Sequence, residues 1–147
     1  MKKFFSPLPI FEEPGLALIR ILTGLFMVYH GMELLDRAKM QEYASWAPTR
    51  GLPFPLLISY LGKSLELAGG LLLATGLWTR LGIALIILAM AYITFGIGNA
   101  RIWYEDQYPF LFIVLGLVFF FRGPGIWSID QSRFDKTIHT TAREKIK

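Results

Sequence analysis

The chain has 147 residues, of which 54% are hydrophobic and only 18% charged, and its mean hydropathy of +0.46 is typical of an integral membrane protein, not of a soluble domain. It contains no cysteine, which excludes disulfides, thiolate metal sites and thiol redox chemistry within the chain, so any redox role would have to use a bound cofactor. The formal net charge of +4 comes from basic residues in the loops and near the ends, where they are expected to act as membrane orientation signals and not as a nucleic-acid-binding surface.

Residues 1–13 are rich in aromatics and interrupted by proline, so we predict an interfacial N-terminal segment and not a cleaved signal peptide. A membrane domain over residues 14–130 follows, predicted to be an all-α integral membrane four-helix bundle. Its first three spans have about 20 residues each, enough to cross a bilayer, whereas the fourth has about 14 and needs flanking aromatics or a thinned bilayer. The predicted spans are residues 15–35, 56–78, 81–100 and 108–121.

The distribution of Lys and Arg predicts the orientation of these spans, because cytoplasmic loops carry an excess of both. Both termini should be cytoplasmic, and residues 131–147 should form a basic cytoplasmic tail that contacts anionic lipid or a partner. The residues assigned to the cytoplasmic side are Lys2, Lys3, Arg80, Arg122, Arg133, Lys136, Arg143, Lys145 and Lys147, against Arg37, Lys39, Arg50 and Arg101 outside.

The first two spans carry charged residues, which cost about 3 kcal/mol each at the centre of a membrane helix and therefore normally face a partner or a wet cavity. Lys63 and Glu66 share one face of the second span, and Arg20, His30 and Glu33 lie along a winding stripe of the first. Because the two spans are antiparallel, Lys63 should lie at the depth of His30 and Glu33, and Glu66 within reach of Arg20. We therefore expect these five groups to converge in one polar pocket between the first two spans.

Residues 36–55 form the longest connection between spans. A helical pattern of apolar and aromatic residues is followed by proline and glycine, which predicts a short amphipathic helix on the outer surface and a kinked entry to the second span. This segment could cap the polar pocket. The tight turn LWTRLG, residues 77–82, makes the second and third spans antiparallel neighbours, and their glycines allow close helix contact.

Two more specific sites are suggested by short motifs and are disfavoured. His30 and Glu33 are near enough to suggest a metal site, but the only other histidine is His139 in the tail, so we predict no metal. Residues 62–64, GKS, echo the end of a phosphate-binding loop, but they lie in an apolar membrane helix and not between a strand and a helix.

The charged residues of the second span allow two interpretations, one structural and one functional. Lys63 and Glu66 could form a purely structural ion pair within one helix. Alternatively, the pocket binds the polar head group of a lipophilic molecule or relays protons, which the additional charges of the first span favour. A transporter is disfavoured because the sequence shows neither interrupted spans nor repeated halves.

Several motifs follow one another along the membrane domain: His30 with Gly31, GLPFP at residues 51–55, ELAGG at residues 66–70, the LWTRLG turn, and GPGIWSID at residues 123–130. In this order they resemble the DoxX family of small bacterial membrane proteins, over residues 17–130. The resemblance implies a compact four-helix bundle in the bacterial cytoplasmic (inner) membrane. Better-known members are similar to subunits of thiosulfate:quinone oxidoreductases or to partners in redox-protective complexes.

His30, Glu66 and the glycines after Glu66 match positions of the family pattern, whereas Lys63 and the basic tail depart from it. It implies no catalytic residue.

Two hypotheses about function follow. In the first, the chain is a subunit or partner of a quinone-linked redox system: Arg20, His30 and Lys63 donate hydrogen bonds to the quinone oxygens, while Glu33 and Glu66 fix these donors and pass protons. In the second, it is a non-enzymatic scaffold or lipid-binding protein whose buried charges are structural. The expected partners are membrane lipid, proteins of a redox complex or further copies of the chain, and not nucleic acid. The sequence leaves open whether the chain is itself an enzyme.

Overall fold

The computed structural model describes residues 11–134, which contain helices and no β-strand. The all-α class is confirmed for this part of the chain, while most of the predicted interfacial segment (residues 1–10) and of the basic tail (residues 135–147) lies outside the described residues. The helices are α1 (Glu12–Gly31), the 3₁₀-helix η1 (Met32–Leu35), α2 (Arg37–Ser45), α3 (Ala47–Arg50), α4 (Pro55–Thr75), α5 (Thr79–Ala91), the π-helix η2 (Tyr92–Ile97) and α6 (Gln107–Arg122).

Three continuous helical segments are long and apolar enough to cross a membrane: Glu12–Leu35, Pro55–Thr75 and Thr79–Ile97. α6 is apolar but shorter, with 16 residues. Many large apolar side chains on these helices are exposed, among them Phe26, Leu61 and Phe121, as expected for surfaces that face lipid and not water. The prediction of a multi-pass membrane protein is therefore confirmed.

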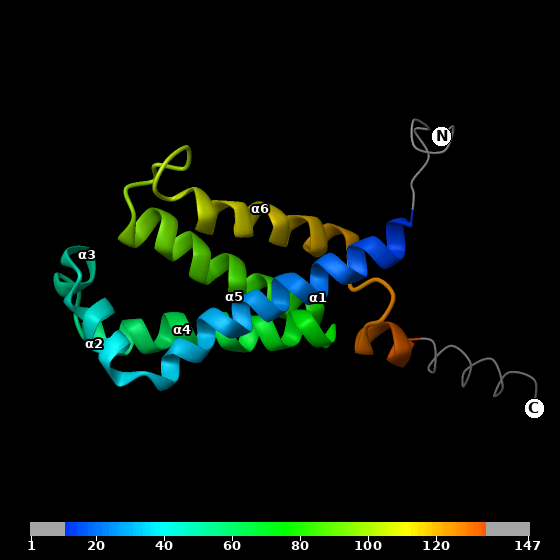
Figure 1. Ribbon diagram of the computed structural model, residues 1–147, viewed down its shortest axis with the longest axis horizontal. Helices are drawn as coiled ribbons and strands as arrows, with labels where there is room; N and C mark the ends of the chain where they lie inside the picture. The colour runs from blue at the N-terminus through cyan, green and yellow to red at the C-terminus, as the bar shows by residue number, and fades with distance from the viewer. Residues whose placement is uncertain (1–10, 135–147) are drawn as a thin grey trace, which may run out of the picture.

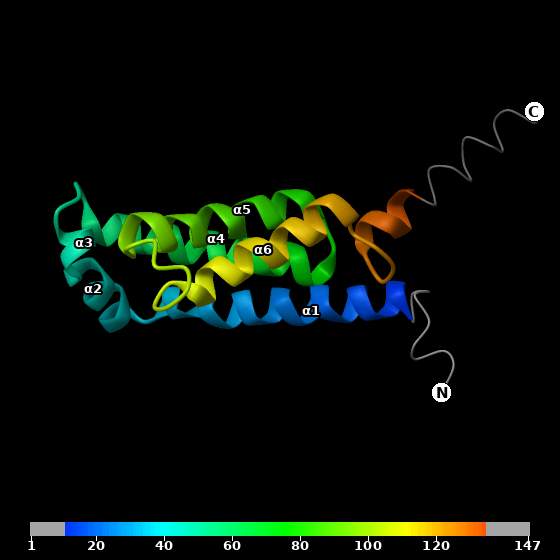
Figure 2. The same ribbon diagram turned by 90° about the horizontal axis from the view of Figure 1, so that it is seen from above.

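The long helices α1, α4, α5 and α6 run side by side along the long axis of the molecule (Figures 1 and 2). The start of α1 and the segment after α6 lie at one end of the bundle, which we call the terminal end. α2, α3 and the loop before α6 lie at the other, the loop end. The connection between the first two spans, expected to form a short helix, contains α2 and α3, and it packs against α4.

α1 and α4 form the closest helix pair, and glycines bring their backbones together. A Cβ added at Gly70 of α4 would lie 2.6 Å from the backbone nitrogen of Val28, and one at Gly24 of α1 would collide with the backbone of Ala74. Small residues at such positions allow the extended van der Waals contact that holds membrane helices together. Little room is left between α1 and α4 for a ligand.

The apolar core lies where α1, α4, α5 and α6 meet. Its buried side chains are Met27, Leu73, Ile83, Ile86, Ala89, Met90 and Phe119. α4 ends at a glycine. Gly76 takes a left-handed conformation with φ of 66°, and the amides of Gly76 and Leu77 donate hydrogen bonds to the carbonyls of Leu73 and Leu72, respectively. This is the Schellman arrangement, in which glycine avoids the strain that other residues would suffer. The second helix therefore stops at Thr75 instead of residue 78.

Candidate functional site

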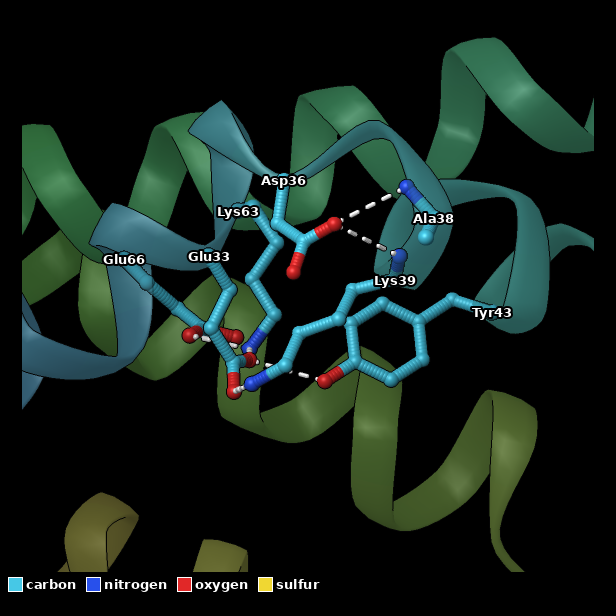
Figure 3. Close-up of polar contacts among 7 residues, drawn as sticks. All are labelled: Glu33, Asp36, Ala38, Lys39, Tyr43, Lys63 and Glu66. Atoms are coloured by element: carbon cyan, nitrogen blue, oxygen red, sulfur yellow. Dashed lines mark hydrogen bonds and ion pairs between the residues drawn. The ribbon is translucent and has the colours of Figure 1, made fainter.

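Four charged side chains of alternating sign form a chain of ion pairs at the loop end (Figure 3). Lys63 lies 2.9 Å from a carboxylate oxygen of Glu66 and 2.9 Å from one of Glu33, and Glu33 lies 2.6 Å from Lys39. The exposed fraction of the side chain rises along this series, from 2% for Glu66 to 14% for Lys63, 19% for Glu33 and 45% for Lys39. We call it the ion-pair chain. It leads from the interior to the surface.

Local structure explains why these residues meet. The 3₁₀-helix η1 turns Glu33 toward α4, and Asp36 then caps α2 by accepting hydrogen bonds from the amides of Ala38 and Lys39. α2 folds back over α4, which places Lys39 beside Glu33 and opposite Lys63.

Tyr43 of α2 completes the cluster. Its hydroxyl donates to Glu33 at 2.8 Å, and the ammonium of Lys63 lies 5.3 Å from the centre of its ring, a cation–π contact. Burial, together with the hydrogen bond to Glu33, raises the pKa of Tyr43, and the hydrogen bond to the same carboxylate raises the pKa of Lys39. Both side chains therefore stay protonated at neutral pH and remain donors to Glu33.

A partly open cavity of about 140 Å³ lies beside the buried end of the ion-pair chain, lined by α4, by α5 with η2, and by α2 with α3. Its polar lining residues are Tyr43, Thr49, Ser59, Lys63, Glu66 and Tyr92. The remaining lining residues are Trp46, Ile58, Gly62, Ala89, Ile93 and Ile97. Ile58, Ile93 and Ile97 are only half-buried, so the cavity can be reached from the surface.

Two polar groups of this wall have no hydrogen-bond partner among residues 11–134. They are the hydroxyl of Thr49, a residue only 1% exposed, and the buried hydroxyl of Tyr92. A buried polar group without a partner costs about 1–3 kcal/mol, so such groups in native proteins usually bond to a water or a ligand. Tyr92 opens the π-helix η2, and π-turns occur frequently at functional sites.

Of the five residues predicted to share one pocket, the structure brings together Glu33, Lys63 and Glu66 and places Arg20 and His30 elsewhere. His30 is exposed and makes an edge contact with Tyr29. It lies about 100° around α1 from Gly31, which packs against α4, and so faces away from the pair.

Arg20 is buried at the terminal end, where it donates hydrogen bonds to the carbonyls of Leu73 at 2.6 Å and Trp127 at 2.8 Å. Leu73 is seven residues beyond Glu66 on α4, about 10 Å along the helix axis. The expected contact between Arg20 and Glu66 therefore does not form, because the guanidinium points toward the segment after α6.

The predicted location of the pocket is also corrected. The glycine contacts close the space between α1 and α4, and no residue of α1 lines the cavity, which lies on another side of α4. Among residues 11–134, no three potential metal ligands come together.

The model of the DoxX family matches residues 15–99, more than half of the chain. The chain belongs to the DoxX family. The DoxX match includes the whole ion-pair chain and every residue that lines the cavity, and it stops before α6. No curated protein and no solved structure matches the chain.

Sequence reasoning missed four polar residues of this site: Lys39, which was considered only as an orientation charge, Tyr43, Thr49 and Tyr92. Tyr43 belongs to the amphipathic pattern of residues 36–55 and Tyr92 is one of few polar residues in the third span, so both were visible as candidates. Thr49 gives no signal of its own, since it stands among the proline and glycine residues of the connection, and only the fold buries it against η2.

Proposed function

We propose that this DoxX protein is a membrane subunit or partner of a quinone-linked redox system and that it binds a quinone-like lipophilic ligand in the cavity beside Lys63. The observation that carries the proposal is a largely apolar cavity whose wall includes the buried end of the ion-pair chain. Apolar walls suit a ring, while the ammonium of Lys63 can donate to a ligand oxygen. Arg20 and His30 are left out of the binding site because they do not reach this cavity.

The ion-pair chain gives the proposed site a route for protons. A quinone takes up two electrons and two protons when it is reduced to the quinol, and in this proposal the electrons come from a partner protein. Glu66 lies at the cavity and Lys39 at the surface, and neighbouring members are within hydrogen-bonding distance. Glu66 and Glu33 would hold and pass protons, while Lys63 between them keeps both carboxylates in place.

The test is mass spectrometry of small molecules that copurify with the protein after mild detergent extraction. A stoichiometric quinone in the wild type, lost in Gly62→Leu, supports the proposal. Gly62 lines the cavity and a Cβ added there meets no atom within 4 Å, so a leucine should occupy the cavity without disturbing helix packing. Gly62→Ala is the matched control and should keep the ligand.

The second candidate function is a non-enzymatic scaffold or lipid-binding protein. Each member of the ion-pair chain has a partner of opposite charge within 2.9 Å, so the charges satisfy one another without a ligand. Recovery of phospholipid alone, together with unchanged quinone reduction in membranes that carry Glu66→Gln, would favour this function over the first.

We further propose that the protein crosses the bacterial inner membrane four times, with α6 as the fourth span and the terminal end in the cytoplasm. An ion pair of 2.6 Å between Glu12 and Arg122 supports this, because it holds the start of α1 and the end of α6 at the same end of the bundle. Reporter fusions placed after residue 134 and within residues 101–106 should report cytoplasm and periplasm, respectively. The same side for both would show that α6 does not cross.

A further inference from the structure

Two features of the cavity, its volume and the unpaired hydroxyls of Thr49 and Tyr92, limit which class of quinone it can bind. We infer that the cavity selects a head group of a single six-membered ring with oxygen substituents, such as a benzoquinone, and rejects a fused two-ring naphthoquinone. We also infer that Thr49 and Tyr92 are the residues that bind its oxygens. This inference rests on the proposed function, since it names the class of ligand for the same site.

The volume sets the limit on ring number. A cavity of about 150 Å³, engineered in another protein and lined by aliphatic and aromatic side chains, holds one benzene. The cavity here has about 140 Å³, so a single ring fills it and a second ring fused to the first would have to extend through its open side. The long tail of a lipophilic quinone needs no room inside, because half-buried isoleucines on α4 and η2 leave the cavity open to the surface.

The hydroxyls of Thr49 and Tyr92 require oxygen atoms on the ligand. Thr49 comes from α3 and Tyr92 from η2, two segments that contact each other, and both hydroxyls are buried and lack a hydrogen-bond partner among the described residues. By contrast, Ser59 and Tyr43, the other lining hydroxyls, already donate to Pro55 and Glu33. Thr49 and Tyr92 are thus the donors that are free to bond a carbonyl oxygen of the ligand.

Lys63 and Glu66 supply further polar groups from α4, whereas the two hydroxyls come from α3 and η2. A ligand that fits both sets of polar groups carries oxygens at two positions of its ring and apolar edges between them. A benzoquinone has this pattern, whereas a hydrocarbon or a fatty acyl chain would leave the hydroxyls of Thr49 and Tyr92 unpaired.

The experiment compares a benzoquinone and a naphthoquinone that carry the same short alkyl tail, titrated into the full-length protein in detergent micelles. Binding is followed by quenching of Trp46, which lines the cavity, with Trp46→Phe to identify its share of the signal. We expect the benzoquinone to bind at least about tenfold more tightly. Thr49→Val and Tyr92→Phe should each weaken its binding by about tenfold, as expected for one hydrogen bond.

Matched controls use the same changes away from the cavity. Thr75→Val removes a hydroxyl that bonds only within its own helix, and Tyr104→Phe removes one on an exposed ring, so neither should change affinity. Ile97→Ala enlarges the cavity and should improve binding of the naphthoquinone relative to that of the benzoquinone.

The results distinguish a failure of the single-ring assignment from a failure of quinone binding itself. Equal binding of both quinones, tighter binding of the naphthoquinone, or full affinity in both hydroxyl variants would overturn the single-ring assignment and leave the proposed function standing. Binding of neither quinone would overturn both, and water or lipid chains would then fill the cavity.

Discussion

Lys63 is the residue on which the candidate site depends, because it pairs with two carboxylates that come from different segments of the chain. Glu66 is its neighbour on α4, whereas Glu33 belongs to η1. Removing one member of a buried ion pair leaves a charge without compensation, which is more costly than replacing the whole group by apolar residues.

Lys63→Met should therefore lower the free energy of unfolding by about 3 kcal/mol, since it leaves Glu66 and Glu33 facing each other without the cation between them. The measurement is thermal or denaturant unfolding in detergent. Adding Glu33→Gln and Glu66→Gln to the Lys63→Met variant should restore part of the loss. A triple variant no more stable than the single one would contradict this explanation.

His30→Ala should change neither ligand affinity nor stability by more than about 0.5 kcal/mol, because the side chain is exposed and its ring packs at an edge against Tyr29, away from the cavity. The same titration and unfolding measurements check it beside Glu66→Gln. A large loss of binding in the His30 variant would show that the first helix contributes to the site after all.

These residues also show how much of the site could be predicted from sequence. The three-residue spacing correctly placed Lys63 and Glu66 on one face of the helix, and the antiparallel depth argument correctly placed Lys63 beside Glu33. The same argument failed for His30 and Arg20, because depth along a helix does not determine which face a side chain occupies. That face depends on the glycine contacts between α1 and α4, which fix the rotation of the helix and are not evident from the charged residues.

At the scale of elements, the pairing of α1 with α4 depends on backbone contact. Gly70→Val should destabilise the protein by about 2 kcal/mol or more, since the added Cβ would approach the nitrogen of Val28 to 2.6 Å. Gly62→Ala, on the same helix, meets no atom within 4 Å and should be neutral or slightly stabilising. Unfolding of both variants in detergent tests this, and equal effects would rule out a specific contact.

A second element-scale contact closes the terminal end. Asp130, in the segment after α6, accepts hydrogen bonds from the amides of Trp78 and Thr79 and from the Thr79 hydroxyl, and thereby caps the start of α5. Burial acts to raise the pKa of Asp130, but these hydrogen bonds outweigh it and lower the pKa below its ordinary value of 3.8.

The sign of this shift predicts a dependence on pH. Because the folded-state pKa is lowered, the stabilisation is fully present above pH 3.8 and is lost as the pH falls through the folded-state value. Asp130→Asn should cost about 1 kcal/mol at pH 7, and its difference from the wild type should shrink below pH 3.8. The unfolding temperatures of the wild type and of Asp130→Asn, measured at pH 7 and below pH 3.8, test this. A difference in unfolding temperature that is as large in acid as at pH 7 would contradict it.

At the scale of the whole molecule, hydropathy and segment length predicted the helices well. The expected spans of residues 15–35 and 56–78 correspond to α1 with η1 and to α4, and the third to α5 with η2. The ends of the helices differ from the predicted ends where a local turn stops the helix, as at Gly76 after α4. The π-helix and the cavity beside it could not be predicted, because they arise from how α2, α3 and α5 pack around α4 and not from any local pattern.

α6 is the element whose length fits a bilayer least well. Its 16 residues cover about 24 Å, short of a hydrocarbon core of about 30 Å. Arg122 at its end is paired with Glu12, so this end of the helix lies beside a charged group that requires a polar surrounding. With α6 as the proposed fourth span, the bilayer should be thinner around α6 than around α1.

The alternating signs of the ion-pair chain have an electrical consequence. Two positive and two negative charges sum to zero, so an uncharged molecule meets a site without net charge and carries no charge through the membrane field when it binds, whereas a charge that crosses the field would feel up to about 2.3 kcal/mol per 100 mV. An uncharged molecule should then enter and leave equally well in energised and de-energised cells.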